Sequence, residues 1–104
     1  MGKKDNIREL IILLALSLSH RIGSIINKNE IYAEKYAKES ENFLNKAKKV
    51  VLRENWSAQD KIIIKEELRK KLRDELTKRD FLDNKKFDIM DEEIYKVLKS
   101  LDLI

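Results

Sequence analysis

Residues 7–26, IRELIILLALSLSHRIGSII, are far more apolar than the rest of the chain. Most of the sequence after Asn27 is charged and amphipathic, whereas this segment carries large aliphatic side chains on most sides of a helix. A helix on the surface of a small domain needs only one apolar stripe. The segment therefore predicts a helix that is either enclosed by other helices or shared with a second copy of the chain.

The apolar side chains of this segment fall on two sides of the predicted helix. The second side carries Ile12, Leu13 and Leu16, which a monomer with a single apolar face leaves in water. A small domain of three or four helices rarely encloses one helix completely, so we favour packing against a second copy, most simply in a dimer. The first side has the spacing of an ordinary core face and consists of Ile7, Leu10, Ile11, Leu14, Leu18, Ile22 and Ile25.

Small residues recur every four positions in the same helix, at Ala15, Ser19 and Gly23. Such a strip allows another helix to approach closely, as is best known from helices within membranes. The alternative is that Gly23 only weakens the helix before it ends at Asn27. The predicted self-association surface consists of Ile12, Leu13, Ala15, Leu16, Ser19 and Gly23.

Length and composition predict one all-α domain over residues 1–104. The chain has no Pro, no Cys and only two Gly, so it lacks the turn residues that hairpins require. We expect a bundle of three long helices, at about 7–26, 30–53 and 58–79, and a short C-terminal helix from about Asp91. The lack of Cys excludes disulfides and thiolate zinc sites and fits a reducing compartment, so we expect a cytoplasmic protein.

Local signals mark where the predicted helices begin. Asn6 and Glu9 have the spacing of a capping box at the start of the first helix, and Ser57 and Asp60 have it at the start of the third. The single tryptophan, Trp56, precedes that third helix, where it is expected to close the end of the core with its indole N–H bonded to a partner.

The arrangement of charge points to a second function. There are 23 Lys and Arg residues against 19 Asp and Glu residues, so the net charge is only +4. On the second predicted helix, however, five bases lie opposite the apolar face and extend over about 27 Å. Such a stripe can bind the phosphates of a nucleic acid with little sequence preference. The alternative is an ordinary solvated face, with Glu39 at its edge. The five bases are Lys35, Lys38, Lys46, Lys49 and Arg53.

The sequence gives no support for catalysis. It contains a single histidine, no cysteine and no glycine-rich phosphate loop, and Ser17 stands where a Glu-x-x-His metal motif needs an acid three residues before His20. Arg21 interrupts the apolar run too early for a membrane span. We therefore expect a non-enzymatic interaction module with no cofactor, no metal, no small-molecule substrate and no membrane partner.

Overall fold

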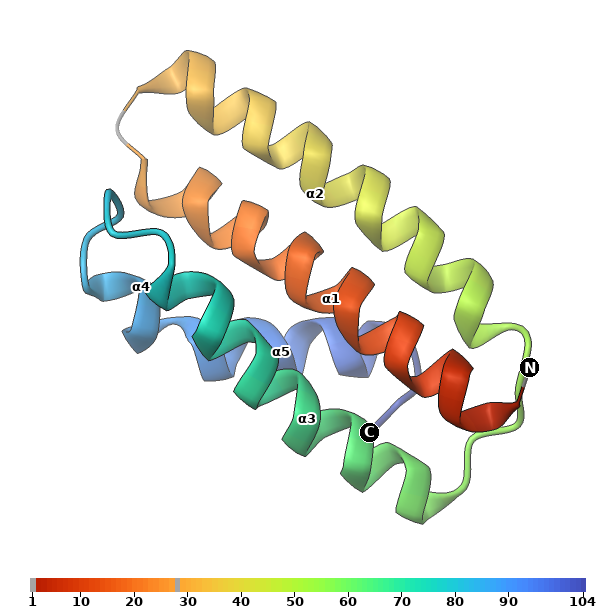
Figure 1. Cartoon of the computed structure of the whole chain (residues 1–104). Coiled ribbons are helices and arrows are strands. Elements are labelled where there is room, and N and C mark those ends of the chain that lie inside the picture. Colours follow the sequence, from red (N-terminus) through yellow and green to blue (C-terminus); the bar gives the residue numbers. More distant parts are fainter. Residues whose placement is uncertain (1, 28) are drawn as a thin grey trace.

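The computed structural model describes residues 2–27 and 29–104, and every regular element in them is a helix (Figure 1). The predicted all-α bundle is confirmed. The one element that the sequence did not predict is α4, a single turn inside the expected polar connection between the third and last helices. The helices are α1 (Lys3–Ile26), α2 (Glu30–Val51), α3 (Ala58–Thr77), α4 (Lys85–Asp88) and α5 (Met90–Ser100).

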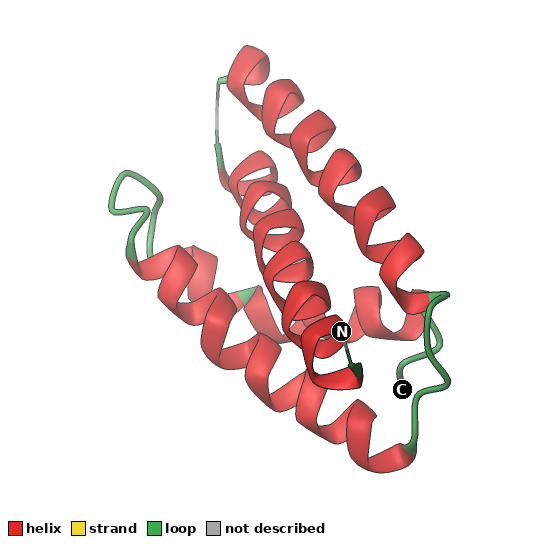
Figure 2. Cartoon of the chain, turned by 45° about the vertical axis from the view of Figure 1, so that its right-hand side comes forward, coloured by secondary structure: helices red, strands yellow, loops and turns green. Residues whose placement is uncertain are grey.

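The first helix, α1, lies at the centre of the bundle. It contacts each of the other four helices, whereas α2, within the described residues, contacts α1 alone. Figure 2 shows α1 in the middle, with α2 on one side and α3 and α5 on the other. The helices α1 and α3 run in parallel, and an ion pair of 2.6 Å joins Lys3 and Asp60 at their starts. The helices α2 and α5 run in the opposite direction (Figure 1). The chain's own helices thus cover much of α1, but Ile12 on its second side is 41% exposed, so packing against a second copy stays a prediction.

The core is built around the inner side of α1. Leu10, Leu14 and Ile22 of α1 are completely buried, and α3 contributes a four-residue repeat of leucines and isoleucine that is equally buried. Complete burial of one such side chain stabilises the fold by about 1.5–3 kcal/mol. Ile25 was expected on this face, but it lies in the last turn of α1 and is 52% exposed. The α3 residues are Ile64, Leu68, Leu72 and Leu76.

The start of α1 lies earlier than the sequence predicted. The helix begins at Lys3, and the carboxylate of Asp5 accepts a hydrogen bond from the backbone N–H of Gly2. Asn6, the predicted cap, lies inside the helix and donates to the carboxylate of Glu54 at 2.6 Å. The predicted capping box was wrong because long-range partners occupy its side chains.

The predicted start of α3 is confirmed. The hydroxyl of Ser57 accepts the backbone N–H of Asp60, and the carboxylate of Asp60 accepts the backbone N–H of Ser57. The ammonium group of Lys3, and then that backbone N–H, hold the pKa of Asp60 below its ordinary value. The indole N–H of Trp56 donates to the carbonyl oxygen of Val51 at 2.9 Å, as expected for a tryptophan that closes the core.

By length and composition alone, α1 could also cross a membrane, and no other helix in the described parts of the chain meets that criterion. In this structure the same helix forms the core of a bundle. A central core helix and a membrane helix share an apolar composition, so composition does not separate the two roles.

Shortening a core side chain of α1 should destabilise the whole bundle. We expect Leu14→Ala to lower the free energy of unfolding by about 2–5 kcal/mol, because Leu14 is completely buried and the mutation leaves a cavity. Ile25→Ala in the same helix should cost about 0.5 kcal/mol or less, as is usual for an exposed position. Urea unfolding followed by circular dichroism measures both, and equal losses would contradict the central place of α1.

Candidate functional site

Four of the five predicted phosphate-binding residues lie on the outer side of α2, and the fifth, Arg53, follows the end of that helix. We call Lys35, Lys38, Lys46, Lys49 and Arg53 the basic face; all five are exposed. No described helix covers the basic face, because α2 contacts only α1. The four lysines thus lie on α2 as the helical spacing predicted, whereas Arg53 was expected inside the helix and lies beyond its end.

The four lysines of the basic face form no ion pair with any described residue. Arg53 differs, because its guanidinium lies 2.6 Å from the carboxylate of Glu9 on α1. On α3, by contrast, several bases are neutralised by neighbouring acids. Those pairs are Lys70 with Glu67, and Lys71 and Lys78 with Glu75. The four lysines of α2 therefore form a row of exposed bases without ion pairs along one helix.

Glu39, the acid at the edge of the basic face, contacts His20, the only histidine of the sequence. His20 of α1 is nearly buried, and its Nε2 lies 2.8 Å from the carboxylate of Glu39 on α2. Its Nδ1 lies 2.7 Å from the carbonyl oxygen of Leu16, so both ring nitrogens face acceptor oxygens. The rings of Tyr36 and Phe43 pack beside the imidazole. Glu39 therefore points toward α1, and His20 helps to hold α2 in place.

The small-residue strip of α1 lies inside the chain's own bundle. Ala15 and Ser19 have no exposed surface, and Gly23 is buried as well. The ring of Tyr36 on α2 packs against Gly23, where an added Cβ would lie 3.3 Å from a ring carbon. The strip does allow a close approach, but its neighbour belongs to the same chain. These three residues are therefore removed from the predicted self-association surface.

The other three residues of that surface are exposed to different extents. Ile12 is 41% exposed, whereas Leu13 and Leu16 are half-buried. Ile12 also lines a groove between α1 and α3, together with Ile7 and Ile11, with a volume of about 620 Å³. The groove has a rim of mixed charge, formed by Lys4 and Arg8 of α1 and by Glu67, Lys70, Lys71 and Asp74 of α3.

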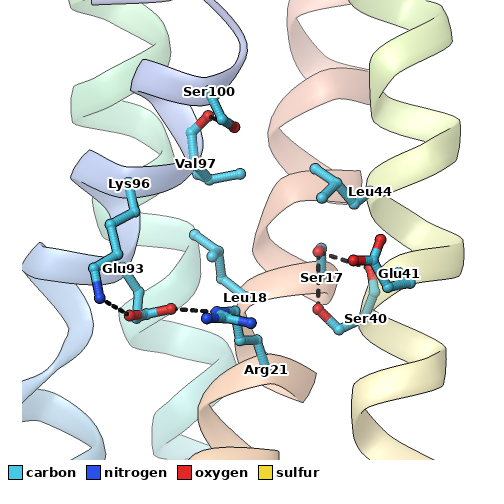
Figure 3. A pocket seen from close by; sticks show the side chains of 10 residues that line it. All are labelled: Ser17, Leu18, Arg21, Ser40, Glu41, Leu44, Glu93, Lys96, Val97 and Ser100. Atoms are coloured by element: carbon cyan, nitrogen blue, oxygen red, sulfur yellow. Dashed lines mark hydrogen bonds and ion pairs between the residues drawn. The ribbon is translucent and has the colours of Figure 1, made fainter.

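A cleft of about 170 Å³ between α2 and α5 was not predicted (Figure 3). Three helices that meet only in the folded chain supply its lining, so no local pattern could reveal it. One signal was present in the sequence: Glu93 is an acid in phase with the buried residues Met90 and Val97 of α5. The cleft is lined by Ser17, Leu18 and Arg21 of α1, Ser40, Glu41 and Leu44 of α2, and Glu93, Lys96, Val97 and Ser100 of α5.

Ion pairs organise one side of this cleft. The side chain of Glu93 is only 5% exposed, and its two oxygens bind Nε of Arg21 and Nζ of Lys96. Glu92, and then Glu93, raise the pKa of Lys96 above its ordinary value, so this group keeps its charge. A buried carboxylate needs such partners, because an unpaired buried charge is strongly destabilising.

On the other side of the cleft, two serines bond to each other. The hydroxyl of Ser17 donates to the carbonyl oxygen of Ser40 at 2.9 Å, and the two hydroxyl oxygens lie 3.2 Å apart. These small polar side chains join α1 to α2.

The described residues contain no group of three or more His, Asp or Glu side chains arranged to hold a metal ion. Comparison with known proteins gives no match to a family model, to a curated protein or to a solved structure.

Removing the histidine contact should weaken the attachment of α2. We expect His20→Phe to lower the free energy of unfolding by about 1 kcal/mol, the usual net contribution of a hydrogen bond, because Glu39 loses its partner. Glu39→Gln, which keeps an acceptor oxygen, should cost less. Chemical unfolding of both variants measures this order, and a His20→Phe variant as stable as the wild type would contradict it.

Proposed function

We propose that the protein is a non-enzymatic binding protein whose basic face contacts the phosphates of a nucleic acid. The observation that carries the proposal is the set of four exposed lysines without ion pairs on a helix with only one neighbour. Elsewhere, on α3, acids of the same helix neutralise several of the bases. A polyanion is the partner that an extended row of unneutralised lysines attracts.

The geometry sets the size of the expected effect. Lys35 and Lys49 lie about 21 Å apart along the helix at 1.5 Å per residue. Four phosphate contacts give a salt dependence with a slope of about −3.6 on logarithmic axes for duplex DNA. The affinity should then fall about 100-fold between about 50 and 200 mM salt. Lysine is a point charge that carries no base-reading code, so sequence preference should be weak.

Reversing charges on the basic face should abolish this binding. We expect the triple variant Lys38→Glu, Lys46→Glu and Lys49→Glu to bind a fluorescent mixed-sequence duplex about 100-fold more weakly than the wild type at low salt. Fluorescence anisotropy provides the measurement.

The matched control makes the same change in net charge at three exposed lysines elsewhere, Lys65, Lys70 and Lys85. It should retain most of the affinity. Equal losses in the two triple variants would mean that only net charge matters, and no binding by the wild type at low salt would refute the proposed function.

Self-association is the second candidate, and one observation favours it. Ile12 is a large, exposed apolar side chain that lines a groove together with Ile7 and Ile11. An apolar groove of this kind is a common site of contact between protein chains. With the small-residue strip buried, we propose that any contact between copies centres on Ile12.

Sedimentation velocity at rising protein concentration tests this second candidate. If Ile12 lies at an interface, Ile12→Ser should shift the protein from dimer toward monomer. Ile62→Ser is the control, because Ile62 is also exposed, at 52%, and does not line the groove. A wild type that is monomeric throughout, or a dimer that survives Ile12→Ser, would refute self-association through this groove.

A further inference from the structure

We propose that the four lysines of the basic face bridge the two phosphate backbones on either side of the major groove of a DNA duplex. This inference rests on the proposed function, the binding of nucleic-acid phosphates, and names the form of nucleic acid that the spacing of the lysines fits. It depends on where the lysines lie along α2 and on the residue at their centre, Asn42.

The four lysines form two pairs with a gap between them. Lys35 and Lys38 are one pair, and Lys46 and Lys49 are the other. The members of a pair are three positions apart, or about 4.5 Å along the helix axis. The gap from Lys38 to Lys46 is eight positions, or about 12 Å. Asn42 lies four positions from each inner lysine, so it is the centre of a symmetric pattern.

These five residues lie on the same side of α2. At about 100° per residue, the lysines fall within about 80° of one another, and Asn42 is at the centre of that arc. All five are exposed, and α2 contacts α1 alone among the described helices, so a rigid duplex can reach the row. Figures 1 and 2 both show α2 at the edge of the bundle.

The acids of α2 lie beside this row and not within it. Glu39, about 60° from Asn42 around the helix, contacts His20. Glu34 and Glu41 lie about 80–100° from Asn42 on the other side. Neither of them forms an ion pair with a described lysine of the row. The arc of the helix that holds the four lysines therefore contains no acid.

The gap between the pairs matches the major groove of B-form DNA. That groove is about 12 Å wide between its two backbones, whereas the minor groove is about 6 Å wide. With α2 across the major groove, each lysine pair lies at one backbone and Asn42 lies over the open groove. The groove is about 8.5 Å deep, so the short side chain of Asn42 does not reach the base edges, which agrees with weak sequence preference.

A single strand fits this pattern less well. It has one backbone and no groove, so a gap in the row of lysines only removes a contact that an unbroken row provides. Four contacts give a steeper salt dependence with a duplex than with a single strand. At about 50 mM salt, the wild type should therefore bind a duplex about tenfold more tightly than one of its strands.

A fifth lysine at the centre of the row tests the bridging directly. Asn42→Lys adds a charge where the proposal places open groove, so the affinity for a mixed-sequence duplex of about 20 base pairs should change by less than about twofold. The affinity for one strand of that duplex should rise about fivefold, because a flexible backbone can follow an unbroken row. Fluorescence anisotropy at about 50 mM salt measures both affinities.

A second variant keeps the net charge and closes the gap. Lys35→Asn combined with Asn42→Lys leaves four lysines in one unbroken row. It should bind the duplex about tenfold more weakly than the wild type and no better than Lys35→Asn alone, because one phosphate contact is lost and the new lysine does not replace it. A double variant with the duplex affinity of the wild type would overturn the proposal.

The matched control is Asn84→Lys, the same change at an exposed position in the connection before α4. It should leave both affinities within about twofold of the wild type. A gain in Asn42→Lys that is as large with the duplex as with the strand, or a wild type that binds both equally, would overturn the bridging but leave the phosphate contact in place. A wild type that binds neither would refute the proposed function and this inference with it.

Discussion

The burial of α1 by its own chain is the constraint on which the rest of the structure depends. This helix is apolar on most of its circumference, and the other four helices all contact it. A helix with several apolar sides is stable in water only if its neighbours cover them, so the amphipathic α2, α3 and α5 can each contribute one narrow apolar face. The balance between one apolar helix and three charged ones explains how a chain of 104 residues with 40% charged side chains forms a core.

The outer position of α2 follows from this arrangement. Its only neighbour is α1, and buried or half-buried polar contacts supplement the apolar packing between the two helices. The pairs His20 with Glu39 and Ser17 with Ser40 connect their facing sides. Because every such contact points toward α1, the opposite side of α2 stays open and carries the basic face. The same separation of α2 from α5 leaves the cleft over Arg21 between them.

Features that depend on local spacing could be predicted from the sequence, and features that depend on packing order could not. The capping box of Ser57 and Asp60 and the exposure of the four lysines on α2 follow from a few residues on one helix, so they were predicted correctly. The small-residue strip correctly indicated a close approach, but no pattern on α1 reveals that Tyr36 of the same chain supplies the contact. The predicted cap at Asn6 was wrong, because the side chain of Asn6 donates a hydrogen bond to Glu54, which is distant in sequence. The cleft could not be predicted, because its lining residues come from three helices that meet only in the folded chain.

Hydrogen exchange of the α1 amides, measured by nuclear magnetic resonance over a range of protein concentrations, tests the central claim most directly. If one chain encloses α1, the amides from Leu10 to Ile22 should exchange only through global unfolding, more slowly than those of α2, and at rates independent of concentration. Protection of these amides that appears only as the protein associates would contradict the account, because it would show that a second copy supplies the cover for α1.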